Sequence, residues 1–158
     1  MKIKTGLGQD SHRFDNENTE KKLVLGGVEF EGTKPLKGNS DADVVLHALC
    51  NAISGVTGVN VLGKMTDELC QQGITDSQVY VQEALKYLKE WQITHVSFSI
   101  ECKTPKITPK IVEMKQKISE LLDLTVDDVG ITATTGEGLT AFGQGEGIQV
   151  FCILTAVA

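Results

Sequence analysis

The stretch that decides the fold is SDADVVLHALCNAISGV, residues 40–56. Apolar side chains recur through it at the three- and four-residue spacing of an α-helix: Val45, Leu49, Ala52, Ile53 and Val56. Ser40 is a favourable N-cap, and a carboxylate at Asp43 suits the positive end of a helix dipole. The pattern therefore predicts an amphipathic helix that begins at Ser40.

A second face of this helix carries polar side chains. At about 100° per residue, His47 lies about 200° from both Val45 and Leu49, so it faces away from the apolar stripe. Asp43, His47 and Asn51 follow one another at four-residue spacing. A solvated helix face would explain this ridge, although a ridge without Lys, Arg or Glu is unusual for a face that meets only water. Spacing alone leaves both interpretations open.

The N-terminal segment, residues 2–14, alternates weakly and becomes polar from Gln9, as a strand running out toward a site would. Side chains two residues apart on a strand project to the same side, so Asp10 and His12 are expected to share a face. A carboxylate and an imidazole are two ligands of a cation such as zinc, but two ligands do not complete a zinc site. The Asp10–His12 pair alone therefore does not predict a metal site.

The rest of the chain mixes strands with helices. Further strands are predicted at 23–25, 28–30, 96–100, 129–133 and 148–158. The resulting fold class is an α/β (α+β) two-layer sandwich, with a mixed, four-stranded type of sheet and helices on one face.

Two further helices are predicted, one from Asp76-Ser77 and one from Thr108-Pro109 through Leu122. The side chains expected inside the former are Val79, Ala84, Leu85 and Leu88. His95 lies between a helix and a strand and is interpreted as structural. No element is assigned to the Gly-broken segment at 60–75.

Size and charge limit the function classes. The 158 residues suit one domain, 1–158, with a substantial core. No apolar run approaches the roughly 20 residues of a membrane span, and residues 1–4 do not open a signal peptide. A net charge of -6 argues against a nucleic-acid partner. We expect a cytoplasmic protein, or one of a plastid-like compartment if a transit peptide has been removed.

The four cysteines are Cys50, Cys70, Cys102 and Cys152, and no two are close enough for a Cys-x-x-Cys knuckle. Reduced and mostly buried thiols are expected, rather than disulfides or a zinc-thiolate site. A metal would therefore need other ligands.

Two later segments have residues that suit phosphate. Lys103 and Lys106 precede a predicted helix N-terminus, which attracts anions, although an ordinary loop would look the same. In 134–138, hydroxyls can hold phosphate oxygens, and Glu137 offers an oxygen ligand to Mg²⁺ or Mn²⁺. The Gly-rich segment 143–147 lacks the strand-then-helix setting of a dinucleotide fingerprint.

Taken together, these stretches resemble the 2-C-methyl-D-erythritol 2,4-cyclodiphosphate synthase family over nearly the whole chain. The matching motifs keep the order and spacing of the family: Gly8-x-Asp10-x-His12-x-Phe14, Leu25-Gly26-Gly27-Val28, Ser40-Asp41-Ala42-Asp43-Val44-x-x-His47-Ala48, Leu62-Gly63-Lys64, Asp76-Ser77, Pro105-Lys106-x-x-Pro109, Ala133-Thr134-Thr135-x-Glu137-x-Leu139 and Gly143-x-Gly145-Glu146-Gly147-Ile148. The resemblance implies a homotrimer with active sites in clefts between subunits.

The resemblance also implies a reaction and a site. The 2-phosphate of 4-diphosphocytidyl-2-C-methyl-D-erythritol 2-phosphate attacks the β-phosphorus, and CMP leaves as the cyclic diphosphate forms. One Zn²⁺ per subunit is implied on Asp10, His12 and His47, and a second divalent ion, Mg²⁺ or Mn²⁺, at Glu137. The catalytic positions implied are Thr135 and Asn39. The substrate-binding positions implied are Ser40, Asn51, Leu62, Gly63, Lys106, Ile107, Thr108, Ala133, Thr134 and Gln144.

Several positions depart from the family pattern. Asn39 replaces a His, Asn51 replaces an Asp, and Gly138 replaces a Lys. Val61 replaces an Asp that contacts the erythritol hydroxyls, so Val61→Asp is expected to strengthen substrate binding. Gln144 replaces an Arg that lines a cavity on the trimer axis. The metal centre is kept, whereas substrate recognition is eroded.

These departures leave an alternative to the enzyme: a catalytically impaired, zinc-bearing trimer that binds a nucleotide or diphosphate for regulation. A third interpretation, a zinc hydrolase acting on another phosphorylated substrate, lacks an obvious general base.

Overall fold

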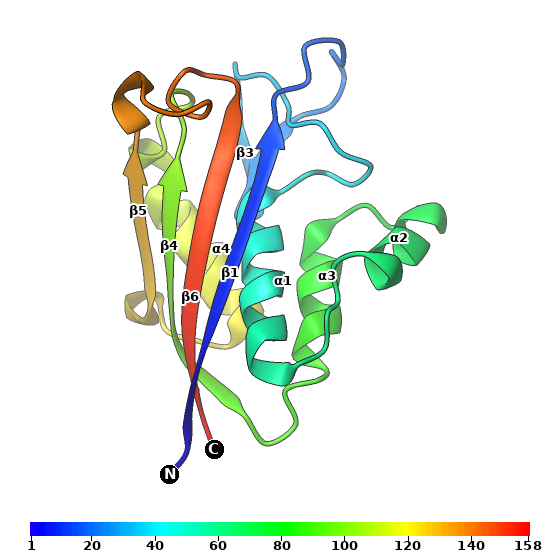
Figure 1. The fold of residues 1–158 in the computed structure, drawn as a ribbon, viewed down its shortest axis with the longest axis vertical. Helices are drawn as coiled ribbons and strands as arrows, with labels where there is room; N and C mark the ends of the chain where they lie inside the picture. Colours follow the sequence, from blue (N-terminus) through cyan, green and yellow to red (C-terminus); the bar gives the residue numbers. More distant parts are fainter.

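The computed structural model describes residues 1–158, and its centre is a four-stranded sheet (Figure 1). The strands lie in the order β1 (Ile3–Arg13), β6 (Gly147–Val157), β4 (Gln92–Glu101) and β5 (Val129–Thr134). β6 pairs antiparallel with both β1 and β4, whereas β4 and β5 are parallel. The predicted mixed sheet is confirmed.

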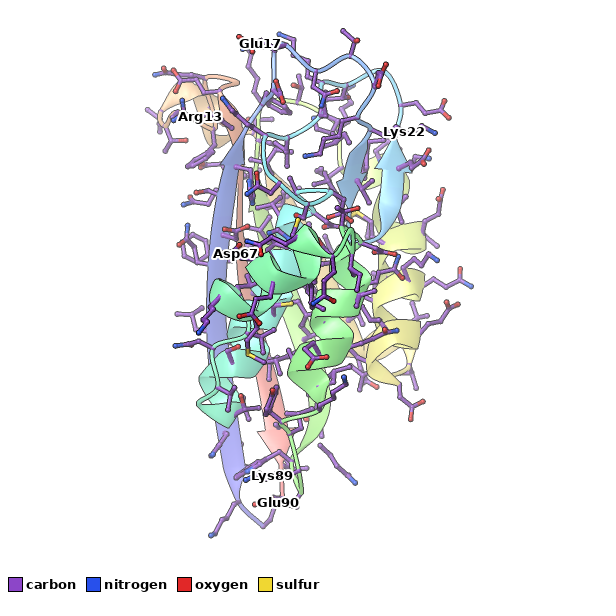
Figure 2. The ribbon with its side chains drawn as sticks, turned by 90° about the vertical axis from the view of Figure 1, so that its right-hand side faces the viewer. Arg13, Glu17, Lys22, Asp67, Lys89 and Glu90 are labelled. Atoms are coloured by element: carbon purple, nitrogen blue, oxygen red, sulfur yellow. The ribbon has the colours of Figure 1, made fainter.

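Helices cover one face of this sheet, which confirms the predicted two-layer sandwich. The helices are α1 (Val44–Thr57), α2 (Lys64–Gln71), α3 (Ser77–Leu85) and α4 (Ile111–Leu122). α1 packs on β1 and β6, α4 packs on β5, and α3 packs against α1. Figure 2, in which Asp67 marks α2, shows α2 as the outermost helix. None of the helices has the length and apolar character that crossing a membrane would require.

Shorter elements connect these layers. β2 (Leu23–Leu25) and β3 (Val28–Phe30) form a separate two-stranded hairpin. Single 3-10 turns are present at η1 (Thr108–Lys110), η2 (Val126–Asp128) and η3 (Gly136–Gly138). The predicted third helix therefore begins as a 3-10 turn at Thr108 and becomes α-helical at Ile111.

α1 lies directly against β1 because β1 has glycine where the two backbones meet. A Cβ atom at Gly8 would lie 2.0 Å from the carbonyl oxygen of Ala48, and one at Gly6 would lie 2.0 Å from that of Ala52. No side chain fits into either gap. This close approach brings His47 of α1 beside the end of β1.

The core includes more of α1 than the sequence pattern predicts. All five residues of the predicted stripe are buried, but Leu46 and Cys50, on other sides of the helix, are buried too. α1 lies between the sheet and α3, so it is covered on both sides. His47 is only 8% exposed, and the interpretation of its ridge as a solvated face is wrong.

The start of α1 differs from the prediction. The N-cap is Asp43, whose side chain accepts a hydrogen bond from the Leu46 N–H, and not Ser40. Ala42 has a φ of 56°, in the left-handed region, so the helix cannot extend back through it. Ser40 instead lies in a turn and accepts a hydrogen bond from the Ala42 N–H.

Two other predictions need correction. In α3, Tyr80, Val81 and Ala84 are buried, whereas Val79 is only half-buried. Leu85, and Leu88 beyond the end of the helix, are half-buried and pack against the core. The Gly-broken segment contains α2, which the pattern did not indicate. The predicted N-terminus of α3 is confirmed, because Asp76 is its N-cap.

Candidate functional site

The three predicted ligands converge where the end of β1 meets the first turn of α1. His12 Nε2 lies 3.0 Å from Asp10 Oδ2, and His47 Nδ1 lies 3.2 Å from the same oxygen. The two ring nitrogens are 3.3 Å apart. Asp10 and His12 share one face of β1, as their spacing predicts. Their two ligand atoms and that of His47 form a nearly equilateral triangle.

This triangle fits a small tetrahedral cation. Ligand bonds of about 2.0–2.1 Å, as zinc makes to nitrogen and oxygen, hold tetrahedral ligand atoms about 3.3–3.4 Å apart. The observed separations of 3.0–3.3 Å are close to this value. Asp10 and His12 keep 23% and 21% of their side-chain surface exposed, so a fourth ligand can approach from solvent.

The tautomer of His12 follows from its second nitrogen. Nδ1 lies 2.7 Å from the backbone carbonyl oxygen of Lys37. A carbonyl only accepts, so Nδ1 carries the proton and Nε2 keeps its lone pair toward Asp10 and His47. The Lys37 carbonyl is thus an outer partner of the kind that orients metal-binding histidines.

The close approach of these side chains shifts the pKa values of Asp10 and His12. Burial by itself would raise the pKa of Asp10, but hydrogen bonds and charge from His12 and His47 outweigh it and lower that pKa to about 2. Burial opposes protonation of His12, yet the Asp10 carboxylate raises the pKa of His12 above its ordinary value. The Asp10 carboxylate and the His12 imidazole therefore each favour the charged form of the other.

His47 has partners that sequence reasoning missed. Its Nε2 lies 2.8 Å from Ser77 Oγ on α3, and Ser77 Oγ also contacts Asp41 Oδ1. Both Asp41 and Ser77 belong to motifs quoted above, but nothing in their spacing indicated that they meet at His47. Ser40, a predicted substrate-binding residue, lies at the same nitrogen, with its Oγ 3.4 Å away.

The segments expected to hold the diphosphate lie at the other edge of the sheet. Ala133 and Thr134 end β5, Thr135 caps η3, and Glu137 is exposed with a φ of 50°. Two strands separate β5 from β1, and strands lie about 4.8 Å apart, so these edges are separated by about 14 Å. Within one chain these residues do not join the metal ligands.

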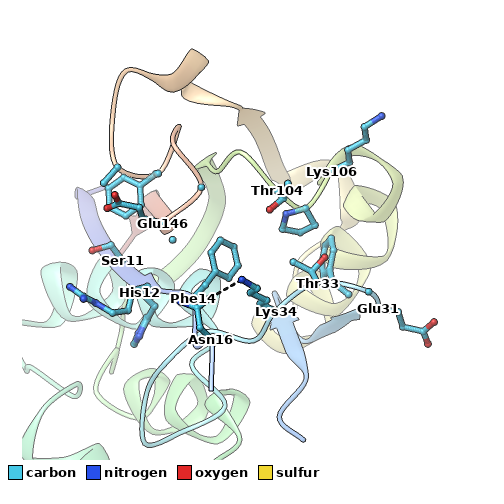
Figure 3. A pocket seen from close by; sticks show the side chains of 18 of the residues that line it. Ser11, His12, Phe14, Asn16, Glu31, Thr33, Lys34, Thr104, Lys106 and Glu146 are labelled. Carbon is cyan, nitrogen blue, oxygen red and sulfur yellow. Dashed lines mark hydrogen bonds between the residues drawn. The ribbon is translucent and has the colours of Figure 1, made fainter. Parts of the chain in front are cut away.

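The Lys106 segment lies between these edges. A cavity of about 1080 Å³ is bordered by Ser11 and His12 on one side and by Thr104, Pro105 and Lys106 on another (Figure 3).

Within this segment the side chains differ in access to ligand. Figure 3 shows the Lys106 side chain directed away from the centre of the cavity. Ile107 is 3% exposed and belongs to the hydrophobic core. Thr108, the first residue of η1, is exposed.

The remaining predicted positions are scattered over the same end of the molecule. Asn51 lies one turn beyond His47 on α1, and its Nδ2 donates to the Gln9 carbonyl at 3.1 Å. Asn39 is exposed, and its carbonyl accepts a hydrogen bond from Cys70 Sγ. Leu62 and Gly63 precede α2.

Gly138 and Gln144, two positions that depart from the family pattern, are in contact. Gln144 Nε2 donates a hydrogen bond to the Gly138 carbonyl at 3.4 Å. Val61, expected beside the erythritol, is 1% exposed and belongs to the hydrophobic core. The expectation for Val61→Asp is therefore wrong, because an aspartate there would enter the core and not a substrate site. His95 lies in β4, exposed on the face of the sheet without helices.

Comparison with known proteins gives strong sequence matches. The YgbB family profile matches residues 3–157. A Chlamydia trachomatis serovar L2b protein named 2-C-methyl-D-erythritol 2,4-cyclodiphosphate synthase is 51% identical over 154 residues, covering 96% of this chain and 86% of that protein. A Chlamydia felis protein of the same name is 50% identical over 156 residues, covering 98% and 89%.

Solved structures share the fold. A Plasmodium falciparum structure, described as IspF in complex with CDP, has a TM-score of 0.84 at 25% identity and covers 98% of this chain and 96% of that one. The bifunctional IspDF of Campylobacter jejuni has a TM-score of 0.86 at 28% identity, covering 98% of this chain. This chain spans 42% of that longer protein.

Proposed function

Because this chain belongs to the YgbB family, we propose that it cyclises 4-diphosphocytidyl-2-C-methyl-D-erythritol 2-phosphate to 2-C-methyl-D-erythritol 2,4-cyclodiphosphate and releases CMP. The observation that carries the proposal is the triangle of ligand atoms from Asp10, His12 and His47 on this family's fold. The chain is an enzyme, a synthase of the phosphorus–oxygen lyase type, like the relatives at 51% identity.

The reaction is an internal phosphoryl transfer. An oxygen of the 2-phosphate forms a bond to the β-phosphorus, and the bond from that phosphorus to the oxygen bridging the two phosphates breaks. The electron pair leaves with CMP. No side-chain nucleophile is needed, so the protein must align the two phosphates and offset their charge.

The metal assignment is part of the proposal. Asp10, His12 and His47 hold one Zn²⁺ per chain, which supplies a Lewis acid to a phosphate oxygen. The mixed nitrogen and oxygen donor set and the separations of 3.0–3.3 Å support this assignment. Glu137 provides an exposed carboxylate for a second, harder ion such as Mg²⁺ or Mn²⁺.

The cytidine diphosphate part binds at the edge formed by β5 and the segment before α4. Thr134 and Thr135 offer hydroxyls to phosphate, and Lys106 offers a positive charge. The other proposed contact positions are Ala133, Ile107, Thr108, Leu62, Gly63, Asn39, Ser40, Asn51 and Gln144. A CDP complex of a structure with this fold supports a nucleotide ligand.

A homotrimer completes the site in this proposal. The metal edge and the nucleotide edge are about 14 Å apart in one chain, so a second chain must bring its β5 edge to the metal. The face of the sheet without helices exposes Ile3, Leu7, Phe151 and Ile153, an apolar surface that a neighbouring chain would cover. We further propose that residues 1–158 form one domain and act in the cytoplasm, which suits four unpaired cysteines.

The test is direct. Purified protein is incubated with the diphosphocytidyl substrate, Zn²⁺ and Mg²⁺, and CMP and the cyclic diphosphate are followed by chromatography and phosphorus NMR. His12→Ala should abolish both zinc content and product. His95→Ala, the same change on the opposite face of the sheet, should retain zinc. Wild type that binds CDP without forming product would instead be the impaired nucleotide-binding trimer.

A further inference from the structure

The two ring nitrogens of His47 have different surroundings. Nδ1 faces Asp10 and His12, at 3.2 and 3.3 Å. Nε2 faces α3, where Ser77 Oγ lies 2.8 Å away. Either nitrogen of a neutral imidazole can carry the proton, so the surroundings decide which one presents a lone pair to a metal.

Counting protons assigns the tautomer. Asp41 contacts only donors: its carboxylate accepts from the N–H groups of Asp43 and Ser77 at 3.1 and 3.0 Å, and from Ser77 Oγ. A hydroxyl has one proton, and Ser77 donates it to Asp41. The contact between Ser77 Oγ and His47 Nε2 must then use a proton on Nε2. The lone pair of His47 consequently lies on Nδ1.

We propose that Ser77 and Asp41 are positioning residues of the metal centre, which hold His47 with its proton on Nε2 and its Nδ1 lone pair toward the metal. This inference rests on the proposed metal site. In metal-free protein the Asp10 carboxylate, 3.2 Å from Nδ1, competes for the same proton. The Ser77–Asp41 pair opposes that competition, and so keeps Nδ1 ready for the cation.

Position and burial favour this pair over other neighbours. Ser77 is fully buried at the start of α3, and its Oγ is nearer to Nε2 than Ser40 Oγ is, at 2.8 against 3.4 Å. The outer partner of His12 is a backbone carbonyl, which substitution cannot remove. The outer partner of His47 is a pair of side chains, so its contribution can be measured.

The experiment compares Ser77→Val with Ser77→Thr. The two side chains have the same shape, but only Thr keeps a hydroxyl. Zinc affinity is measured by competition with a chelator, and loss of an outer partner should weaken it about 10- to 100-fold in the Val variant. The Thr variant should bind zinc more tightly than the Val variant. Asp41→Asn should also weaken zinc binding. Asp41 accepts from the N–H and the hydroxyl of Ser77 with two oxygens, whereas the amide of Asn has only one.

A second measurement does not depend on metal. Nitrogen NMR of His47 in metal-free protein, above the pH at which its imidazole is charged, should show the proton on Nε2 in wild type. In Ser77→Val the proton should move toward Nδ1, where Asp10 accepts it. A role of Ser77 limited to packing α3 would change stability and leave the tautomer unchanged.

The outcomes separate the two proposals. Wild type that binds no zinc overturns the metal assignment, and the tautomer measurement then still decides the role of Ser77. Zinc affinity in Ser77→Val equal to that of wild type, or an unchanged tautomer, overturns the inference. If both Ser77 variants fail to fold, Asp41→Asn decides by the same two measurements.

Discussion

At the scale of the residue, one buried carboxylate joins two parts of the chain. Asp43 accepts hydrogen bonds from the Leu46 N–H at 3.1 Å, and from the N–H groups of Gly26 and Gly27 at 2.9 and 2.7 Å. It therefore caps α1 and ties the β2–β3 turn to it. Burial raises the pKa of Asp43 from 3.8 to about 6, against the three N–H donors that lower it.

This pKa predicts a pH dependence of stability. Between pH 3.8 and about 6 the folded protein holds a proton on Asp43 that the unfolded chain has lost. The free energy of unfolding should fall by about 3 kcal/mol as pH rises through this window, and this contribution should be constant above it. Urea unfolding with a chelator present, at several pH values, measures the slope. Asp43→Asn should lack this fall in the free energy of unfolding. The same pH dependence in both proteins would contradict the assigned pKa.

Val61 occupies a position at which the family contacts substrate, but its side chain is buried in the hydrophobic core. Val61→Asp should lower the free energy of unfolding by about 3 kcal/mol or more, because a carboxylate buried without a partner is costly. Val112→Asp is the matched control, since Val112 is 74% exposed at the start of α4 and should tolerate the change. Equal stabilities of the two variants would show that position 61 is accessible to water.

At the scale of the element, the distance between α1 and β1 sets the geometry of the candidate metal site. Asp10 and His12 come from the strand, and His47 comes from the helix. Their ligand atoms are 3.0–3.3 Å apart only because glycines let the two backbones touch. A shift of α1 away from β1 would lengthen the distances from His47 to Asp10 and His12.

Gly8→Ala tests this dependence. Its Cβ would lie 2.0 Å from the Ala48 carbonyl oxygen, so α1 must move away. The stability should fall by about 1–3 kcal/mol, as in other overpacked cores, and zinc affinity should fall with it. Gly55→Ala on α1 is the control, because its nearest contact would be an ordinary 3.4 Å. Retention of wild-type zinc affinity in Gly8→Ala would mean that the site tolerates a displaced helix.

At the scale of the whole molecule, the two halves of the proposed site lie on opposite edges of one sheet. On the face without helices, Leu7 and Ile153 are direct neighbours in the β1–β6 pairing and are 65% and 47% exposed. Apolar neighbours of this kind on an open sheet are typical of an interface between chains.

The proposed homotrimer predicts a definite sedimentation result. Wild type should sediment at three times the 17.1 kDa chain mass, and a monomer at micromolar concentration would refute the assembly. Ile153→Asp should dissociate it, because the new charges would meet at the interface without partners. Val112→Asp, on the opposite layer, should remain trimeric.

The sequence by itself determined the strands, the main helix and the fold class, whereas the three candidate ligands came from the resemblance to a family. Those features depend on side-chain periodicity and residue type, which are local. It could not determine that α1 is buried on both sides, that Asp43 and not Ser40 caps it, or that residues 64–71 are helical. Each of these depends on what packs against the segment, and packing is decided by the rest of the chain.

Contacts between residues far apart in the sequence could not be predicted from it and are decided by the tertiary structure. His47 reaches Asp10 across 37 positions of sequence, and Asp41 meets Ser77 across 36. Spacing indicates which side chains share a face of one element, but not which faces of two elements touch. That choice is made by the burial of apolar surface over the whole core, which presses α1 onto β1 and α3 onto α1 and thereby places the partners of His47.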